Sequence, residues 1–144
     1  MFADPTTPSP VVIEDATVAG SRIEAVVRVT DSRYLRTTAF PGIAERSLEL
    51  LPGILRHRCE CGSAHGIAAE LADTETAHLL EHVALELMAL GGSPRTLRGE
   101  TRWDFRADGR GVFRVTLEYD DEHRVRDAFD RAAELVNELL SAGR

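Results

Sequence analysis

The sequence predicts an α+β fold of two layers, in which a mainly antiparallel sheet carries helices on one face. Apolar and polar residues alternate in paired segments, which is typical of β-hairpins, and other segments repeat apolar residues at helical spacing. The predicted order is ββα, a loop, α, ββα. At 144 residues the chain has the length of one ordinary domain.

The N-terminal residues 1–10 are rich in proline and lack both the basic start and the apolar stretch of a signal peptide. We therefore expect a disordered leader at 1–10, followed by one domain at 11–144, in a cytoplasmic protein. No apolar run approaches the roughly 20 residues needed to cross a bilayer, so a soluble protein is expected.

The first predicted unit is a hairpin followed by a short helix. Residues 11–18 form a β-rich run, and the turn at 19–21 connects it to a strand whose apolar members are Ile23, Ala25, Val27 and Val29. A helix is predicted from Ile43 to Leu51, where Pro52 and Gly53 end it.

The middle of the chain contains a loop and the predicted central helix. Residues 57–66 show no periodicity and are expected to form a loop. Asp73 or Thr74 can cap a helix that runs to about Leu90, where Gly91 and Gly92 follow.

The last predicted unit is a second hairpin and a long helix. Strands are expected at 101–106 and 112–119 around a turn at 108–111. The helix spans residues 121–141, with an apolar stripe formed by Val125, Phe129, Ala132, Val136 and Leu139.

The acidic net charge of the chain limits which kinds of partner it is expected to bind. With 24 acidic and 17 basic residues the net charge is −7, which argues against nucleic acid and anionic membranes, since both require a clustered positive field. A small or cationic substrate is compatible with this charge. The two cysteines, Cys59 and Cys61, are one residue apart and are not expected to form a structural disulfide.

The central helix carries the candidate site. A helical wheel places His78, His82 and Glu86 in one sector with Glu81 beside it, and the apolar residues opposite, so the polar set is expected on the side away from the core. Histidines at i and i+4 can bind one metal ion together, and the order H-x-x-E-H is the inverzincin motif.

This pattern predicts a metal-dependent hydrolase. His78 and His82 are the predicted ligands of Zn²⁺ or another divalent metal, which would activate a water molecule. Glu81 is the predicted general base. Glu86 is predicted as the third metal ligand, with hydrogen bonding to an imidazole as its alternative role.

The preceding loop offers other ways to complete the site. Cys59 or His57 could supply the third ligand in place of Glu86. Alternatively, the loop thiols could close a purely structural metal site, or Cys59, Cys61 and His65 could be bystanders, because Cys-x-Cys lacks the usual zinc spacing. A polar helical face of this composition can also be only a solvated surface.

The chain resembles the N-terminal domain of cyanophycin synthetase over roughly residues 40–140. The resemblance rests on four blocks in order. They are Phe40-Pro41-Gly42 through Leu50-Leu51-Pro52-Gly53; His57-x-Cys59; His78-Leu-Leu-Glu81-His82-Val-Ala-Leu-Glu86-Leu; and Gly111-Val-Phe-Arg-Val-Thr-Leu-Glu118-Tyr119. The third block is the most specific of the four.

In that family the domain precedes an ATP-grasp module and a Mur-ligase-like module, which build a polymer with an aspartate backbone and arginine side groups. The resemblance implies polymer binding and, as in some members, a zinc peptidase site. It implies metal binding by His78 and His82, a general-base role for Glu81, and a place beside the metal for Glu86.

Together these observations predict a zinc-dependent metallopeptidase or amidase that cleaves cyanophycin or a related peptide containing aspartate and arginine. The alternative is a non-catalytic module that binds the polymer or docks on a separate ligase chain while retaining the motif. A homo-oligomer is compatible with either hypothesis.

Overall fold

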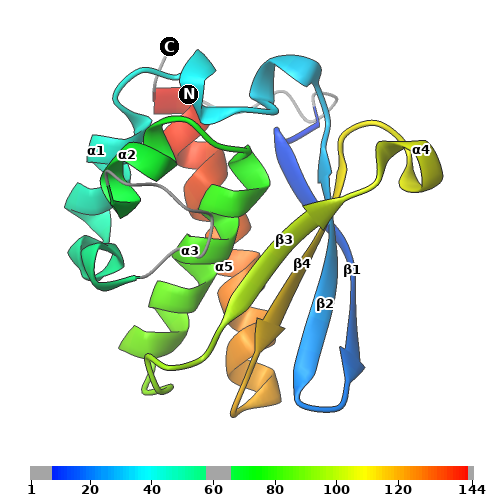
Figure 1. Ribbon diagram of the computed structural model, residues 1–144, viewed down its shortest axis with the longest axis vertical. Coiled ribbons are helices and arrows are strands. Elements are labelled where there is room, and N and C mark those ends of the chain that lie inside the picture. Colours follow the sequence, from blue (N-terminus) through cyan, green and yellow to red (C-terminus); the bar gives the residue numbers. More distant parts are fainter. Residues whose placement is uncertain (1–7, 58–65, 143–144) are drawn as a thin grey trace.

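Within the residues that the computed structural model describes, 8–57 and 66–142, four antiparallel strands form one sheet in the order β1-β2-β4-β3 (Figure 1). The strands are β1 (Val11–Ala19), β2 (Arg22–Val29), β3 (Gly99–Trp103) and β4 (Val112–Glu118). β1 and β3 are the two edges of the sheet. The first predicted hairpin is confirmed, and its turn at Gly20 and Ser21 lies between β1 and β2.

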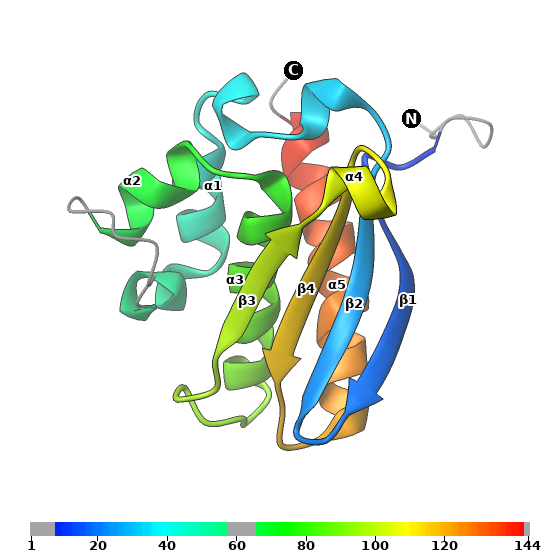
Figure 2. The ribbon, with the colours of Figure 1, turned by 45° about the vertical axis from the view of Figure 1, so that its right-hand side comes forward.

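The helices form the second layer, on one face of the sheet (Figure 2). They are α1 (Ile43–Leu50), α2 (Ile67–Ala72), α3 (Thr76–Leu90), α4 (Phe105–Asp108) and α5 (Glu122–Ala142). Among them, α3 and α5 pack against each other behind the sheet, whereas the short α4 lies at one end of it (Figure 2). The predicted two-layer α+β class is confirmed.

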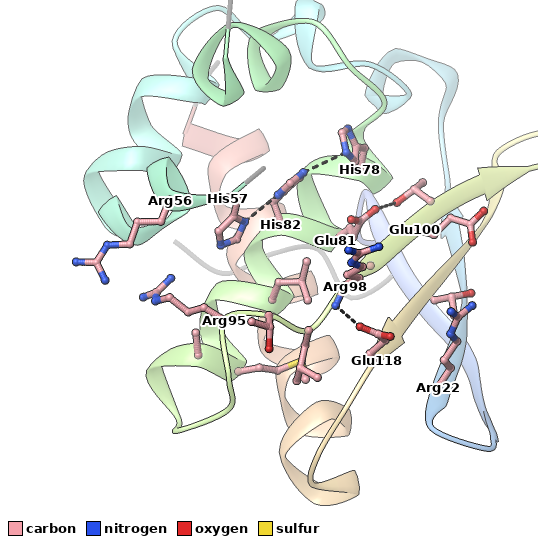
Figure 3. Close-up of a pocket in the computed structure, with 18 of the residues that line it drawn as sticks. Arg22, Arg56, His57, His78, Glu81, His82, Arg95, Arg98, Glu100 and Glu118 are labelled. Atoms are coloured by element: carbon pink, nitrogen blue, oxygen red, sulfur yellow. Dashed lines mark hydrogen bonds between the residues drawn. The ribbon is translucent and has the colours of Figure 1, made fainter. Parts of the chain in front are cut away.

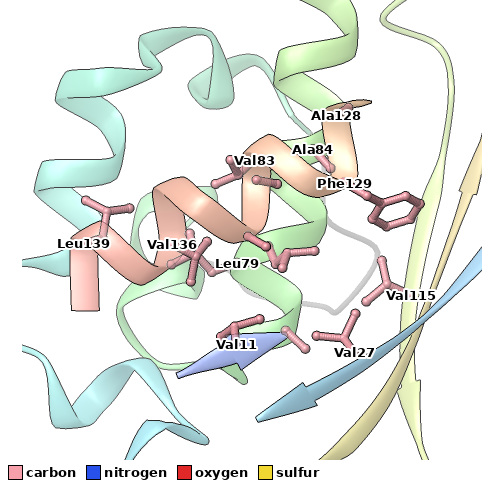
Figure 4. Close-up of a cluster of buried hydrophobic side chains, with 14 of the residues drawn as sticks. Val11, Val27, Leu79, Val83, Ala84, Val115, Ala128, Phe129, Val136 and Leu139 are labelled. Atoms are coloured by element: carbon pink, nitrogen blue, oxygen red, sulfur yellow. The ribbon is translucent and has the colours of Figure 1, made fainter. Parts of the chain in front are cut away.

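The core lies between the sheet and the pair α3 and α5 (Figure 4). The predicted apolar stripes of β2 and α5 are confirmed as buried, with Val29 and Leu139 their most exposed members at only 5% and 4%. Phe129 from α5 and Phe113 from β4 are among the largest side chains that are fully buried. This packing fixes α3 between the core on one side and β3 on the other.

The start of α3 differs from the prediction. Neither Asp73 nor Thr74 caps the helix; the residue before it is Glu75, whose side chain makes no capping hydrogen bond. Instead, the backbone N–H of Thr76 donates to the carbonyl of Leu35 at 2.9 Å. A contact with a distant segment therefore replaces the local cap, which explains why sequence spacing indicated the wrong residue.

The short helix α2 was not predicted. Ile67 and Leu71 are one turn apart and both are buried, but a helix of six residues is too short for its period to be recognised. The predicted loop at 57–66 lies mostly outside the described residues, and so do Cys59, Cys61 and His65.

The second hairpin is shifted and interrupted. β3 begins at Gly99 and ends at Trp103, and the short helix α4 occupies residues that were predicted as strand and turn. The reason is local: the side chain of Asp104 accepts a hydrogen bond from the backbone N–H of Ala107 at 3.2 Å and caps the helix.

None of the helices in the described part of the chain is long and apolar enough to cross a membrane.

Two glycines with positive φ provide a matched test of backbone packing. A Cβ at Gly111, where φ is +85°, would lie 2.6 Å from the backbone oxygen of Val29, whereas a Cβ at Gly20, where φ is +64°, would meet nothing within 4 Å. We expect Gly20→Ala to lower the free energy of unfolding by about 1 kcal/mol, from the left-handed conformation alone. Gly111→Ala should cost more than about 2 kcal/mol, because β2 and β4 must also move apart. Urea unfolding of both variants measures the difference, and equal losses would contradict this account.

Candidate functional site

A cleft of about 1300 Å³ lies between β3 and the 3₁₀ helix η3 (Pro52–Arg56), with α3 along its floor (Figure 3). The floor is formed by His78, Glu81, His82, Leu85, Met88 and Ala89. Residues of η3 and α2 line one wall, and β3 lines the other. The H-x-x-E-H segment therefore faces this cleft.

The cleft contains a compact group of three side chains from α3: His78, Glu81 and His82. Because residues at i, i+3 and i+4 share one helical face, each offers a ligand atom, and these atoms all lie within 4.8 Å of one another. The Nε2 atoms of the two imidazoles are 3.1 Å apart. This His-Glu-His cluster can hold a metal ion.

Two of the three side chains of the cluster are buried, and that of His78 is partly buried. Glu81 is only 5% exposed and His82 only 2%, and Glu86 one turn later is 1% exposed. The polar side of α3 faces away from the core, as expected, but it is not exposed to solvent. β3 and η3 lie beside it and shield these side chains. Interpretation of the motif as a merely solvated face is excluded by this burial.

Behind the cluster, His82 is held by a chain of polar contacts (Figure 3). Its Nδ1 is 2.8 Å from Nδ1 of His57, and Nε2 of His57 is 3.0 Å from Oε1 of Glu86. Arg95 donates to both oxygens of Glu86, at 2.6 Å and 3.0 Å. Glu86 is therefore an ion-paired carboxylate whose oxygens are already engaged.

These contacts favour one arrangement of protons on the histidines. With Glu86 ionised, Nε2 of His57 must carry a proton and donate it, which leaves Nδ1 of neutral His57 as an acceptor. Nδ1 of His82 then donates to His57, so its Nε2 presents a lone pair to the cluster.

His78 can adopt a matching form. Its Nδ1 is 2.9 Å from Oγ1 of Thr74, a hydroxyl that can accept a proton from the imidazole while donating its own to Glu75, 3.3 Å away. In that tautomer Nε2 of His78 also presents a lone pair. The surrounding residues thus fit a bound cation, because both facing nitrogens can be unprotonated at once.

Burial sets the electrostatics of the cluster. It lowers the pKa of His82 to about 3, with further lowering by His78 and His57, and it also lowers the pKa values of His57 and His78. Burial raises the pKa of Glu81 to about 7, although the hydrogen bond from Thr101, at 2.6 Å, partly opposes this. Without a cation the cluster therefore favours neutral side chains.

Glu86 shows the opposite balance. Burial alone would raise its pKa, but the hydrogen bonds from Arg95 and His57 and the positive charge of Arg95 outweigh it, so the pKa lies below its ordinary value. Two carboxylates on one helix are thus held in different states by their neighbours.

The predicted site residues therefore fall into two groups. His78, His82 and Glu81 lie together in the cluster, whereas Glu86 contacts Arg95 and His57 and is not a member of it. For Glu86 the predicted alternative role is a hydrogen bond to the imidazole of a metal ligand. Glu86 instead contacts the imidazole of His57, which in turn contacts His82.

Two residues that were not predicted from the sequence, Arg95 and Thr101, also shape the site. Neither is part of a recognisable motif. Arg95 follows a turn after α3, and Thr101 reaches the cluster from β3, so only the folded chain brings them to the motif.

The raised pKa of Glu81 predicts a pH-dependent stability. The folded protein holds the proton of the Glu81 carboxyl more tightly than the unfolded chain does. The free energy of unfolding therefore has its full value below pH 4.5, the ordinary pKa of glutamate, and it falls as pH rises towards about 7. Glu81→Gln removes this loss while its amide oxygen can still accept from Thr101. In EDTA at pH 8 we expect the variant to be more stable than the parent by on the order of 2 to 3 kcal/mol.

The difference should shrink towards zero as pH falls to 5, measured by urea unfolding at each pH. Glu49→Gln, at an exposed position on α1, is the control and should show no such trend. A Glu81→Gln variant less stable than the parent at pH 8 would contradict the assigned environment.

The sequence matches a family model described as the cyanophycin synthase-like N-terminal domain, over residues 24–141. It is also similar to curated relatives, each named cyanophycin synthetase. The Synechocystis sp. protein is 33% identical over 108 residues, which is 74% of this chain and 12% of the relative. The Crocosphaera subtropica protein is 33% identical over 104 residues, which is 72% of this chain and 12% of the relative.

These comparisons correct the predicted activity. The relatives are named synthetases, and the family description refers to a domain of such an enzyme, not to a peptidase. The prediction of a metal-dependent peptidase or hydrolase is therefore wrong.

The matched region, residues 24–141, extends from within β2 into the last turn of α5. It includes every residue of the cluster and all the lining residues of the cleft except Arg22. The chain spans about 12% of the length of the first relatives it matches. The resemblance that rested on four sequence blocks is confirmed: the chain belongs to the cyanophycin synthase-like N-terminal domain family.

Proposed function

We propose that this chain is a non-catalytic, ligase-associated module that binds cyanophycin or a similar peptide of aspartate and arginine in the cleft beside α3. The observation that carries the proposal is the mixed charge of the cleft. Its basic lining residues are Arg22, Arg56, Arg95 and Arg98, and its acidic ones are Glu70, Glu75, Glu81, Glu100 and Glu118.

A polymer of this kind offers a guanidinium and a carboxylate in each unit. Its guanidinium groups can pair with the acidic lining residues and its carboxylates with the basic ones, which gives register and specificity more than raw affinity. The net charge of −7 does not oppose such a ligand, because the ligand itself carries both signs.

Two exposed lining residues on opposite walls, Arg56 of η3 and Glu100 of β3, test the proposal. We expect Arg56→Glu and Glu100→Arg each to weaken cyanophycin binding several-fold, about the effect of an exposed charge contact. Isothermal titration calorimetry at low salt measures it, since salt screens such contacts.

The control is Arg110→Glu, an exposed position between α4 and β4 that does not line the cleft. It should bind like the parent. The double variant Arg56→Glu/Glu100→Arg retains the net charge and should remain weakened. If Arg110→Glu weakens binding as much as Arg56→Glu, the cleft is not the binding site.

We further propose that His78, His82 and Glu81 hold a divalent metal ion, with zinc favoured by the two nitrogens and one carboxylate oxygen. Glu86, the ligand expected from the sequence, would instead act through His57, whose contact keeps Nε2 of His82 unprotonated. When bound, such an ion supplies a positive charge that can receive a carboxylate of the ligand.

Zinc binding has a direct readout in stability. Because a ligand that binds only the folded state stabilises it, zinc at 100 times its dissociation constant should add about 2.7 kcal/mol to the free energy of unfolding. EDTA should reverse the gain. His78→Gln should abolish it, whereas His123→Gln, at an exposed position on α5, should retain it. If zinc stabilises His78→Gln and His123→Gln equally, it does not bind at the cluster.

A further inference from the structure

The outer edge of β3 borders the cleft and takes no part in the pairing of β3 with β4. β3 has five residues and pairs only with β4 within the described part of the chain. Gly99, Glu100, Thr101 and Trp103 all line the cleft. An edge strand that lies open in a cleft presents backbone donors and acceptors to whatever enters it.

The ladder shows which backbone groups these are. The N–H of Glu118 donates to the carbonyl of Arg98 at 2.9 Å, so Arg98 forms a hydrogen-bonded pair with β4. Such pairs alternate in antiparallel sheets, so Glu100 and Arg102 also point their backbone groups to β4.

The intervening residues Gly99, Thr101 and Trp103 consequently point their N–H and C=O groups away from β4. Within residues 8–57 and 66–142, no hydrogen bond reaches the backbone groups of these three residues. An extended chain that adds beside β3 would satisfy all of them.

We infer that the outer edge of β3 receives an extended peptide backbone, which adds to the sheet as a further antiparallel or parallel strand inside the cleft. Five residues of strand span about 16 Å, so the edge can pair with a short segment of a long polymer. This inference rests on the proposed function and specifies how the polymer is held.

Different side chains lie on the two sides of β3, so the two sides of a peptide bound at its edge would meet different groups. Side chains of an extended chain alternate between two sides. On one side of β3 lies α3 with the His-Glu-His cluster, which Thr101 contacts through Glu81. On the other side lie Glu100, Arg22 and Glu118, charges of both signs that also line the cleft.

The composition of the polymer agrees with this arrangement, because every unit branches from a regular peptide backbone and carries both charges. Alternate branches would meet the acidic and basic residues on the outer face. Hydrogen bonds to the polymer backbone would supply the affinity, and contacts with its charged branches would supply the selectivity. Other cases of strand addition divide the two roles in the same way.

Backbone hydrogen exchange tests the inference directly. With a soluble cyanophycin oligomer at saturation, the amide protons of Gly99, Thr101 and Trp103 that pair with the ligand should exchange at least about ten-fold more slowly by NMR. Those of Glu100 and Arg102, already bonded to β4, should change little. Binding of the oligomer without protection of Gly99, Thr101 or Trp103 overturns the inference and leaves the proposed function standing. Absence of any binding overturns both.

A matched pair of variants tests it independently. Thr101→Val and Thr101→Pro both lose the hydroxyl that donates to Glu81, but only proline also loses the outward N–H. Because that N–H takes no part in the ladder with β4, proline is compatible with this edge position. We expect Thr101→Pro to bind the oligomer about ten-fold more weakly than Thr101→Val. Equal affinities of the two folded variants overturn the inference, and the exchange experiment on the parent decides if Thr101→Pro does not fold.

Discussion

Glu86 is a carboxylate that the fold buries almost completely, and its ion pair with Arg95 is the interaction on which the polar side of α3 depends. An unpaired charge at 1% exposure would cost several kcal/mol. The two hydrogen bonds from Arg95 offset that cost and leave one oxygen shared with His57. His57 in turn fixes His82, so an arginine from the turn after α3 determines how a histidine of the motif is presented.

Among the residues that the structure describes, no such ion pair compensates for the burial of Glu81 in the cluster. His82 and Glu81 are buried where charge is disfavoured, and Glu81 has only the neutral hydroxyl of Thr101 as a hydrogen-bond partner in the described part of the chain. Burial of ionisable groups without a counter-charge lowers stability, and it is typical of sites that a ligand completes. The contrast between Glu86, which is ion-paired with Arg95, and Glu81, which accepts only from a neutral hydroxyl in the described part of the chain, supports the proposed cation site on α3.

The fold was predictable wherever the relevant pattern is local. Period-two alternation in β2 and helical spacing in α5 each depend only on which side of an element faces the core, and both predictions were confirmed. The start of α3 was not predictable, because Leu35 satisfies its first turn from a distant segment. The same limit applies to the site: the motif spacing brings His78 and His82 together, but Arg95 and Thr101 join them only through tertiary packing, which no spacing encodes.

The motif also could not determine what the site does. Two imidazoles and a carboxylate one helical turn apart provide the same ligands to an ion that activates water and to an ion that only attracts a carboxylate, so H-x-x-E-H fixes a geometry and not a reaction. The relatives are named cyanophycin synthetases, and this name favours the second kind of ion in the proposed function. In that setting a cleft of mixed charge next to an open strand edge is suited to holding a long chain, and contacts with its backbone do not depend on which unit of the repeating polymer lies in the cleft.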